Sequence, residues 1–313
     1  GFKVTTLDNL KTRIKNIKKN SSQNLLLNKI DTKYMQTFIN ELSNVYSANQ
    51  VKRQLGHMKE AIKYAVKFYN YPNEHILNSV TLPKKSKTIE DIEKEEAKMY
   101  NYLEMEQVIQ IRDFILNDNN MQYRARILVA GAVEVQALTG MRIGELLALQ
   151  VKDVDLKNKT IDINGTIHRI KCNAGFGHKD TTKTAGSRKI AINSRIANVL
   201  KKIMLENKKM QQWEPSYVDR GFIFTTCQGN PMQGSRINKR LSSAAESLNI
   251  NKKVTTHTLR HTHISLLAEM NISLKAIMKR VGHTDEKTTI KVYTHVTEKM
   301  DRELEQKLEK LVY

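Results

Sequence analysis

The sequence predicts a mainly α-helical protein with a small antiparallel β-sheet, built as two domains. Apolar residues recur at steps of three and four along residues 1–82 and again from residue 194 onward, which is the spacing of amphipathic helices. Three short segments between residues 159 and 193 instead alternate apolar and polar side chains, as strands do. A helical first domain and a mixed second domain follow from this change of period.

Residues 1–82 are expected to be helical, and two stretches show the helical pattern. The stretch LDNLKTRIKNI places Leu7, Leu10, Ile14 and Ile17 on one face. The stretch NQVKRQLGHMKEAIKYAVKFYN repeats the pattern at five further apolar positions. These are Val51, Leu55, Met58, Ile62 and Ala65.

Another face of the second helix carries a row of lysines. They are Lys52, Lys59, Lys63 and Lys67. Their intervals align the side chains in a stripe along the helix, with few acidic residues near it. The stripe is either a solvated face or a row of contacts to DNA phosphates, and the sequence leaves both interpretations open.

A linker is expected at residues 83–102, where a proline and a basic cluster give way to an acidic run. Residues 1–83 hold 13 basic and 5 acidic residues, a net charge of +8. Residues 84–106 carry a net −2 and residues 107–313 a net +14. Two basic domains, 1–82 and 103–313, on a slightly acidic linker suggest a clamp that grips DNA from two sides.

The total charge narrows the class of partner. The chain has 52 Lys and Arg against 32 Asp and Glu, a net charge of +20, which favours nucleic acid or an anionic membrane surface. No run of 18 apolar residues, secretory h-region or lipidation signal is present. DNA is therefore the expected partner, and a membrane or heparin-type binder is the alternative. Cys172 and Cys227 form no CxxC pair, which suits a reducing cytoplasm.

The second domain is expected to begin with two helices. YRARILVAGAVEVQALTG is an apolar helix ended by Gly140, and RIGELLALQ is a shorter helix after it. Three segments are then predicted to be strands of one antiparallel sheet: KTIDING, TIHRIK and SRKIAIN. The stretch NAGFGHKDTTKTAG, residues 173–186, is predicted to be a flexible loop between the last two strands.

The stretch THTLRHTHISLLAEM contains the first candidate catalytic side chains. His257 and Arg260 are one helical turn apart, so both can face one site. Arg142 follows the turn TGM at the start of a helix. Two such arginines in a basic chain are able to form a fork-shaped clamp on one phosphate.

No metal site is expected in this stretch. His257, His261 and His263 have the spacing HxxxHxH, but they lack the glutamate of HExxH and a neighbouring Cys or carboxylate cluster. His261 and His263 are interpreted as structural or DNA-facing. No metal or other cofactor is predicted.

Four motifs together resemble the tyrosine recombinase (phage integrase) family. ALTGMRIGELLAL, TKTAGSRKIAI, HTLRH and GHTDEKTTIKVYTH follow the family's order over roughly residues 103–300. The family pattern maps onto Arg142, Lys183, His257, Arg260, His283 and Tyr293. The resemblance is closest to integrases of phages and conjugative transposons. It implies a helical core-DNA-binding domain at residues 1–82 and a mixed α/β catalytic domain at residues 103–313, which together form a C-shaped clamp around DNA.

The resemblance implies a site-specific recombinase that forms a covalent 3′-phosphotyrosine intermediate. Tyr293 would attack a DNA phosphodiester and release a 5′-hydroxyl. Arg142 and Arg260 would stabilise the negative oxygens of the pentacovalent state, so that no metal is required. Lys183 would protonate the leaving 5′-oxygen. The alternatives are a type IB topoisomerase and a catalytically silent DNA-binding protein.

Supporting roles are expected for two histidines and a glutamate. His257 would assist proton transfer, and His283 would hydrogen-bond the scissile phosphate. Glu145 would orient Arg142 or a neighbouring backbone group.

The choice of Lys183 as proton donor depends on its sequence context. Lys179 and Lys189 lie near the same hairpin. The family's lysine is usually followed by R-x-I/V-x-I/L, and KTAGSRKIAI fits that pattern best from Lys183.

A second group of basic residues lies at the start of a later helix, in GSRINKRLSSAAESL. Arg236, Lys239 and Arg240 are predicted either to contact phosphates or the major groove, or to form a solvated face.

An amphipathic tail helix is expected at about residues 298–311. Its apolar residues are Met300, Leu304, Leu308 and Leu311. Docking on a neighbouring protomer in trans is preferred over packing in cis. The resemblance implies a homotetramer that exchanges these helices on double-stranded core and attachment sites. An excisionase or a DNA-bending protein is a further expected partner, at the nucleoid of a bacterial host cell.

Overall fold

The computed structural model describes residues 4–20, 26–83, 90, 101–172, 175–180, 187–282 and 286–309. The chain divides into two compact units, Gly1–Ile89 and Glu90–Tyr313. Each unit has its own hydrophobic core. Among the described residues, no helix has the length and apolar character needed to cross a membrane.

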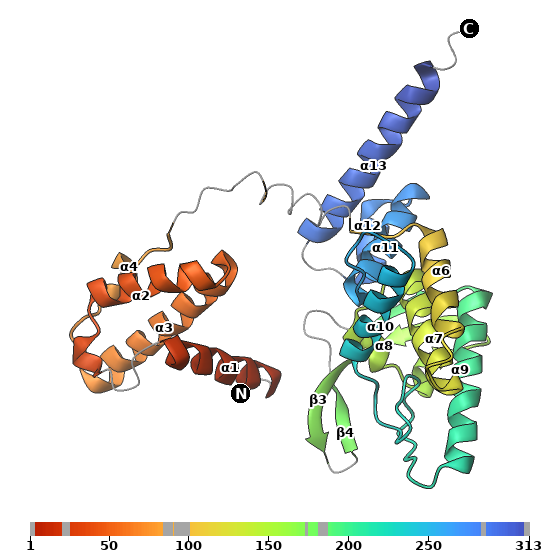
Figure 1. Ribbon diagram of the computed structural model, residues 1–313, viewed down its shortest axis with the longest axis horizontal. Helices are drawn as coiled ribbons and strands as arrows, with labels where there is room; N and C mark the ends of the chain where they lie inside the picture. Colours follow the sequence, from red (N-terminus) through yellow and green to blue (C-terminus); the bar gives the residue numbers. More distant parts are fainter. Residues whose placement is uncertain are drawn as a thin grey trace. The chain divides into compact units, whose positions relative to one another are not determined.

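The first unit is helical, as the sequence predicts (Figure 1). Its elements are α1 (Val4–Asn20), η1 (Leu27–Lys29), α2 (Thr32–Val45), α3 (Ala48–Tyr69) and α4 (Ile76–Ser79). Asp31 caps α2 by accepting a hydrogen bond from the Tyr34 amide at 2.7 Å. Asn70 ends α3 in the left-handed conformation.

The predicted apolar face of α3 is the one that packs into this core. Val51, Leu55, Ile62 and Ala65 are buried, and Met58 packs at the edge of the cluster. Residues of α2 complete the core from the other side, including Met35, Phe38, Ile39 and Leu42.

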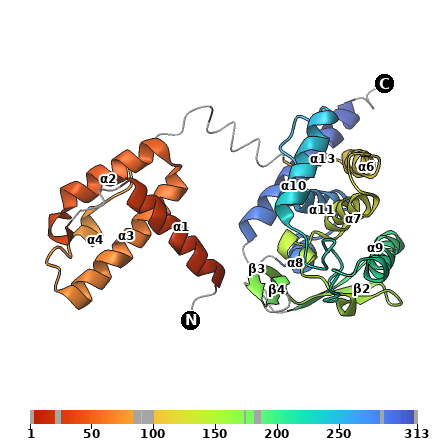
Figure 2. The ribbon, with the colours of Figure 1, turned by 60° about the horizontal axis from the view of Figure 1, so that its bottom comes forward.

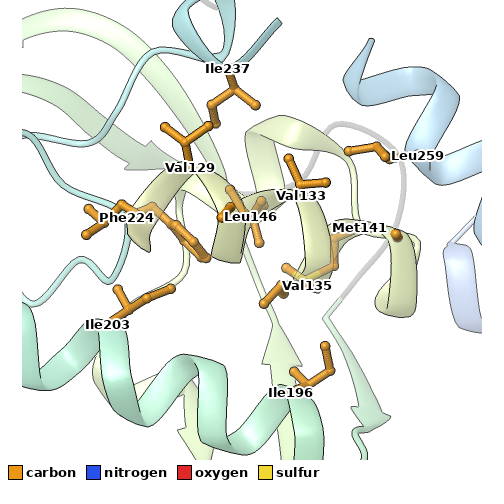
Figure 3. Packing of buried hydrophobic residues seen from close by; sticks show 14 of the residues in the cluster. Val129, Val133, Val135, Met141, Leu146, Ile196, Ile203, Phe224, Ile237 and Leu259 are labelled. Atoms are coloured by element: carbon orange, nitrogen blue, oxygen red, sulfur yellow. The ribbon is translucent and has the colours of Figure 1, made fainter. Parts of the chain in front are cut away.

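The second unit is built around α7 (Tyr123–Thr139), which is buried along almost its whole length. Helices α6 (Met105–Leu116), α9 (Ser194–Trp213) and α11 (Thr256–Glu269) pack against it. Figure 3 shows Val129, Val133 and Val135 among side chains from the surrounding elements. A side chain at Gly131 would place its Cβ 2.6 Å from Ile203, so the glycine allows α7 and α9 to approach closely.

The remaining helices of the second unit are α8 (Ile143–Leu147), α10 (Gly234–Ser247), α12 (Leu274–Val281) and α13 (Glu286–Glu309), with η2 (Val151–Asp153) after α8. Gly140 ends α7 with φ of 67°, as predicted for a helix C-terminus. The helix predicted from RIGELLALQ is shorter than expected, because α8 ends at Leu147.

The strands form two small antiparallel sheets rather than the single sheet that was predicted. One contains β1 (Val154–Asp155), β2 (Thr160–Ile163) and β5 (Arg188–Ala191), in the order β1-β2-β5. The other is a hairpin of β3 (Thr166–Cys172) and β4 (Gly175–Asp180). Figure 2 shows the strands gathered at one side of this unit.

The prediction of a loop throughout residues 173–186 was wrong for β4. Gly175 and Gly177 have φ of 118° and 90°, so neither looks like a strand residue locally. Contacts from far along the chain hold the strand: Asn230 accepts a hydrogen bond from the Phe176 amide at 2.9 Å. Arg220 donates to the carbonyl oxygens of Phe176 and Gly177. These partners lie more than 40 positions away, where local periodicity gives no signal.

Helix α13 begins earlier than the tail helix that was predicted at about residues 298–311. It runs unbroken from Glu286 to Glu309, since this stretch contains neither proline nor glycine. Val292 and Val296 are buried, whereas Leu304 and Leu308 are exposed. Figure 1 shows the C-terminal end of α13 extending beyond the other helices of its unit.

Candidate active site

Arg142 is placed by the turn between α7 and α8. It is the N-cap residue of α8, and its amide donates to Oε2 of Glu145 at 2.9 Å. Its guanidinium Nη1 donates to Oε1 of the same carboxylate at 3.0 Å. The i, i+3 spacing in TGMRIGE therefore allows one buried glutamate to hold both the backbone and the side chain of Arg142. This is the orienting role that the sequence suggested for Glu145.

The Arg142 side chain has a second support and an exposed face. Its Nη2 donates to the carbonyl oxygen of Gly282 at 2.9 Å. The side chain is nevertheless 35% exposed, so the guanidinium is both fixed and accessible.

Arg260 is buried on α11 and holds two helix ends. Its Nη1 donates to the Gly140 carbonyl, and its Nη2 donates to the Val281 carbonyl at 2.6 Å. Burial lowers the pKa of Arg260 to about 9, and repulsion from Arg142 acts in the same direction. The buried cation is therefore one that a neighbouring anion would stabilise.

Arg188, at the start of β5, is a third arginine at this site that the sequence did not single out. Its Nη1 and Nη2 donate to Glu145 Oε1 and Oε2 at 3.1 and 2.7 Å, and its Nε donates to the Arg280 carbonyl at 2.9 Å. A signal was present in SRKIAI. In a strand, Arg188 lies on the same face as the buried Ile190, which is an unusual place for an unpaired cation.

The C-terminal turn of α12 collects all three guanidinium groups. The carbonyls of Arg280, Val281 and Gly282 accept from Arg188, Arg260 and Arg142, respectively. The last carbonyls of a helix have no intrahelical partner and lie at the negative end of the helix dipole, so they attract cations. Gly282 has φ of 66°, and a Cβ there would lie 2.8 Å from Nη1 of Arg188. Both observations explain why the motif GHTDEKTTIKVYTH begins with a glycine, Gly282.

His257 lies on the first turn of α11 and is exposed, three residues before Arg260. His261 is half-buried. Burial lowers the pKa of its imidazole, and the nearby His257 and Arg260 lower it further.

His263 is not DNA-facing, which was one of its two predicted interpretations. It is 2% exposed, with Nδ1 at 3.0 Å from the Ala137 carbonyl and Nε2 accepting from Arg280 at 3.0 Å. Burial, with Arg280 adding to it, lowers the pKa of His263 to about 3. His263 is therefore a neutral structural residue that fixes Arg280, whose carbonyl holds Arg188.

Two predicted catalytic residues, Lys183 and His283, lie outside the described residues. The two other lysines near the hairpin, Lys179 and Lys189, are either bound to a carboxylate or directed away from the arginines. Lys179 makes a 2.6 Å ion pair with the buried carboxylate of Asp153. Lys189 is exposed and neighbours Arg188 on β5, so it lies on the opposite face of the sheet from the arginine site.

Tyr293 lies on α13, which packs against α11 and α12. Its half-buried ring contacts a hydrophobic cluster that includes Tyr102, Ile264 and Val292. Within the described part of the chain, no hydrogen bond joins its hydroxyl to Arg142, His257 or Arg260. The structure thus brings the arginines together and places Tyr293 on a neighbouring helix.

The lysine stripe of α3 is less uniform than predicted. Lys52 and Lys67 are exposed. Lys59 donates to the Val80 carbonyl at 3.2 Å, and Lys63 pairs with Glu60 at 2.9 Å. The expectation that the stripe has almost no acidic partner is therefore wrong for Lys63.

The second predicted group of DNA-contact residues lies on α10. Arg236 and Lys239 are exposed, whereas Arg240 is half-buried with its Nη1 at 3.4 Å from a carboxylate oxygen of Asp118.

The electrostatics of the site favour an anion. The guanidinium groups of Arg142 and Arg188 both bond to one carboxylate, Glu145, and that of Arg260 interacts with the same carboxylate electrostatically. Burial alone would raise the pKa of Glu145, but hydrogen bonds from Arg188 and Arg142 hold that pKa below its ordinary value. In the described residues, no group of three His, Cys, Asp or Glu side chains is arranged to hold a metal ion.

Comparison with known proteins identifies the family. A model of the phage integrase family matches residues 101–300. This chain belongs to the phage integrase family. It is 99% identical over 314 residues to the integrase of Staphylococcus phage L54a, a match that covers all of this chain and 89% of that relative. This chain is therefore a tyrosine site-specific recombinase. The predicted family, fold class and enzyme class are confirmed.

More distant relatives agree. The tyrosine recombinase XerD of Staphylococcus haemolyticus is 28% identical over 212 residues, covering 67% of this chain and 63% of its own length. The fold resembles that of the Tn1549 transposon integrase, solved in complex with transposon right-end DNA. That match has a TM-score of 0.66 at 20% identity and covers 99% of this chain and 95% of the other. The topoisomerase and the silent DNA-binding protein are not favoured.

Proposed function

We propose that this recombinase cuts and rejoins double-stranded DNA with Tyr293 as the nucleophile and with Arg142 and Arg260 binding the scissile phosphate. The supporting observation is the convergence of both guanidinium groups on the end of α12, where Arg142 is fixed by Glu145 and still 35% exposed. A preorganised cationic site of this kind stabilises the charge that develops on the phosphate oxygens.

The proposed reaction is a transesterification. The Tyr293 oxygen attacks phosphorus and loses its proton, with assistance from His257, while the bond from phosphorus to the 5′-oxygen breaks. The leaving oxygen takes a proton from Lys183, which gives a 5′-hydroxyl and a 3′-phosphotyrosine. Attack by a 5′-hydroxyl on the phosphotyrosine reverses these steps and joins the new strands.

Lys183 is proposed as the general acid because the other lysines near the hairpin are unsuited to this role. The ammonium of Lys179 is bound to Asp153, and Lys189 lies on the far face of β5. His283 is proposed to hydrogen-bond the same phosphate, since it directly follows Gly282, whose carbonyl holds Arg142.

DNA binding is proposed for both units. The Tn1549 integrase, which shares this fold, was solved with transposon DNA. Exposed basic side chains of this chain, among them Lys52, Lys67, Arg236 and Lys239, are proposed to contact DNA phosphates.

Strand exchange is proposed to occur in a homotetramer. The exposed Leu304 and Leu308 at the end of α13 are suited to docking on a neighbouring protomer.

A nicked suicide duplex tests this function. On such DNA the cleaved fragment diffuses away, so the covalent protein–DNA adduct accumulates. The wild-type protein is expected to form the adduct without added metal, and Tyr293→Phe is expected to form none while binding the same duplex. An equal yield of adduct from Tyr293→Phe would remove Tyr293 from its proposed role.

A further inference from the structure

We propose that Arg188 is a positioning residue, which holds Glu145 and the end of α12 together so that Arg142 presents its guanidinium to the scissile phosphate. The inference rests on the proposed role of Arg142. It concerns a side chain that does not itself need to touch DNA.

Arg188 bonds to both supports of Arg142. The Arg142 guanidinium is held by the Glu145 carboxylate and by the Gly282 carbonyl. Arg188 makes a two-pronged contact with the same carboxylate and donates to the Arg280 carbonyl, two residues before Gly282. It therefore fixes the separation between α8 and the C-terminal turn of α12, the two elements on which Arg142 depends.

The planar fork of an arginine is required for this task. Two parallel hydrogen bonds from Nη1 and Nη2 orient a carboxylate, and Nε remains free for a third acceptor. A lysine at this position would supply the charge but not the three fixed directions. The side chain is 14% exposed, so water does not replace these contacts readily.

Glu145 depends on Arg188 in turn. The carboxylate is 3% exposed, and burial would raise its pKa. The charged groups facing it are Arg142 on α8, Arg188 on β5 and Arg260 on α11. Without the fork from Arg188, Glu145 takes up a proton at a higher pH, and a neutral Glu145 holds Arg142 less firmly.

Single-turnover cleavage of the suicide duplex tests the inference. Arg188→Met is expected to slow cleavage by about 30-fold at neutral pH, with affinity for the same duplex within about twofold of wild type. Arg188→Lys is expected to recover part of the rate and to remain at least about fivefold slow, because it restores the charge without the fork. If Arg188→Met does not fold, a rate for Arg188→Lys within about twofold of wild type would overturn the inference by itself.

A double-mutant cycle separates positioning from a general loss of stability. If Arg188 acts through Glu145, Arg188→Met combined with Glu145→Gln should cleave no more than about threefold slower than the slower single variant. A double variant whose defect equals the product of the two single defects would contradict the inference. The acid limb of the pH–rate profile should also move to higher pH in Arg188→Met, and Glu145→Gln should remove this shift.

Arg195→Met is the matched control. Arg195 also bonds a buried glutamate in this unit, Glu134, at 2.5 Å, and among the described residues it makes no bond to Arg142, Glu145 or Arg260. The Arg195→Met variant should cleave at the wild-type rate. If Arg142→Ala cleaves at the wild-type rate, the proposed phosphate role of Arg142 is wrong. If Arg188→Met cleaves at the wild-type rate while Arg142→Ala is slow, only the positioning role of Arg188 is wrong.

Discussion

Arg142 is exposed over 35% of its side chain while Glu145 and Gly282 fix its guanidinium. A donor held in this way needs no reorganisation when charge develops on the phosphate. Arg142→Ala is therefore expected to slow cleavage about 100-fold with little change in duplex affinity, measured by single-turnover cleavage of the suicide duplex. Cleavage within about threefold of wild type would contradict the phosphate role.

His263 makes a second prediction at this scale, about stability. Its folded pKa of about 3 lies below the ordinary value of 6.5, so between these values the unfolded chain binds a proton that the folded chain does not. Stability is then fully present above pH 6.5 and falls as the pH drops toward 3, by up to about 1.4 kcal/mol per pH unit.

Urea unfolding at a series of pH values measures this slope. His263→Gln should flatten it, and the exposed His75→Gln should leave it as in wild type. Equal slopes in wild type and His263→Gln would show that His263 is not held neutral.

The meeting of Arg142 and Arg260 at one site could be predicted, because each lies at a turn or helix start within a motif of the family that the sequence resembles. Their catalytic roles stay proposals. For Arg188 the sequence offers only the signal of a cation on the buried face of a strand, since the carboxylate and the carbonyl that it contacts lie 43 positions earlier and 92 positions later. Sequence spacing within one helix or strand carries no record of such partners. Lys183 and His283 stay predictions.

At the scale of elements, the end of α12 organises the site. Gly282→Ala would force a side chain into the left-handed region, at about 1–2 kcal/mol, and would push its Cβ against Arg188. Both a loss of stability in urea unfolding and slower cleavage are expected.

Gly56→Ala is the matched control for this substitution. Gly56 lies inside α3, and a Cβ there meets nothing within 4 Å. It should be neutral or stabilising by up to about 1 kcal/mol. A Gly282→Ala protein with wild-type stability and cleavage would show that the close packing at α12 is not required.

The elements themselves were predictable to different degrees. The buried face of α3 was predictable from the three- and four-residue spacing of its apolar side chains, because that spacing depends on one helix alone. The strand β4 did not, because Arg220 and Asn230 hold an irregular, glycine-containing segment in place. For α13, a long helix could have been inferred from the absence of proline and glycine across residues 286–309.

At the scale of the whole molecule, the net charge of +20 predicts binding that weakens steeply with salt. Replacing Lys52 or Lys67 by glutamine should make the fall of log affinity with log salt less steep, for any DNA sequence. The magnitude of the slope should decrease by about 0.9 for each phosphate that the protein no longer neutralises. Lys33→Gln, an exposed lysine on α2, is the control. An unchanged slope in both α3 variants would remove this face from the DNA interface.

The site of DNA attachment tests the central claim most directly. The wild-type adduct with the suicide duplex would be digested with protease and nuclease, and the residual nucleotide located by mass spectrometry. We predict a 3′-linked nucleotide on Tyr293, in a peptide from α13. A nucleotide attached to any other side chain, or linked through its 5′-phosphate, would contradict the proposed reaction.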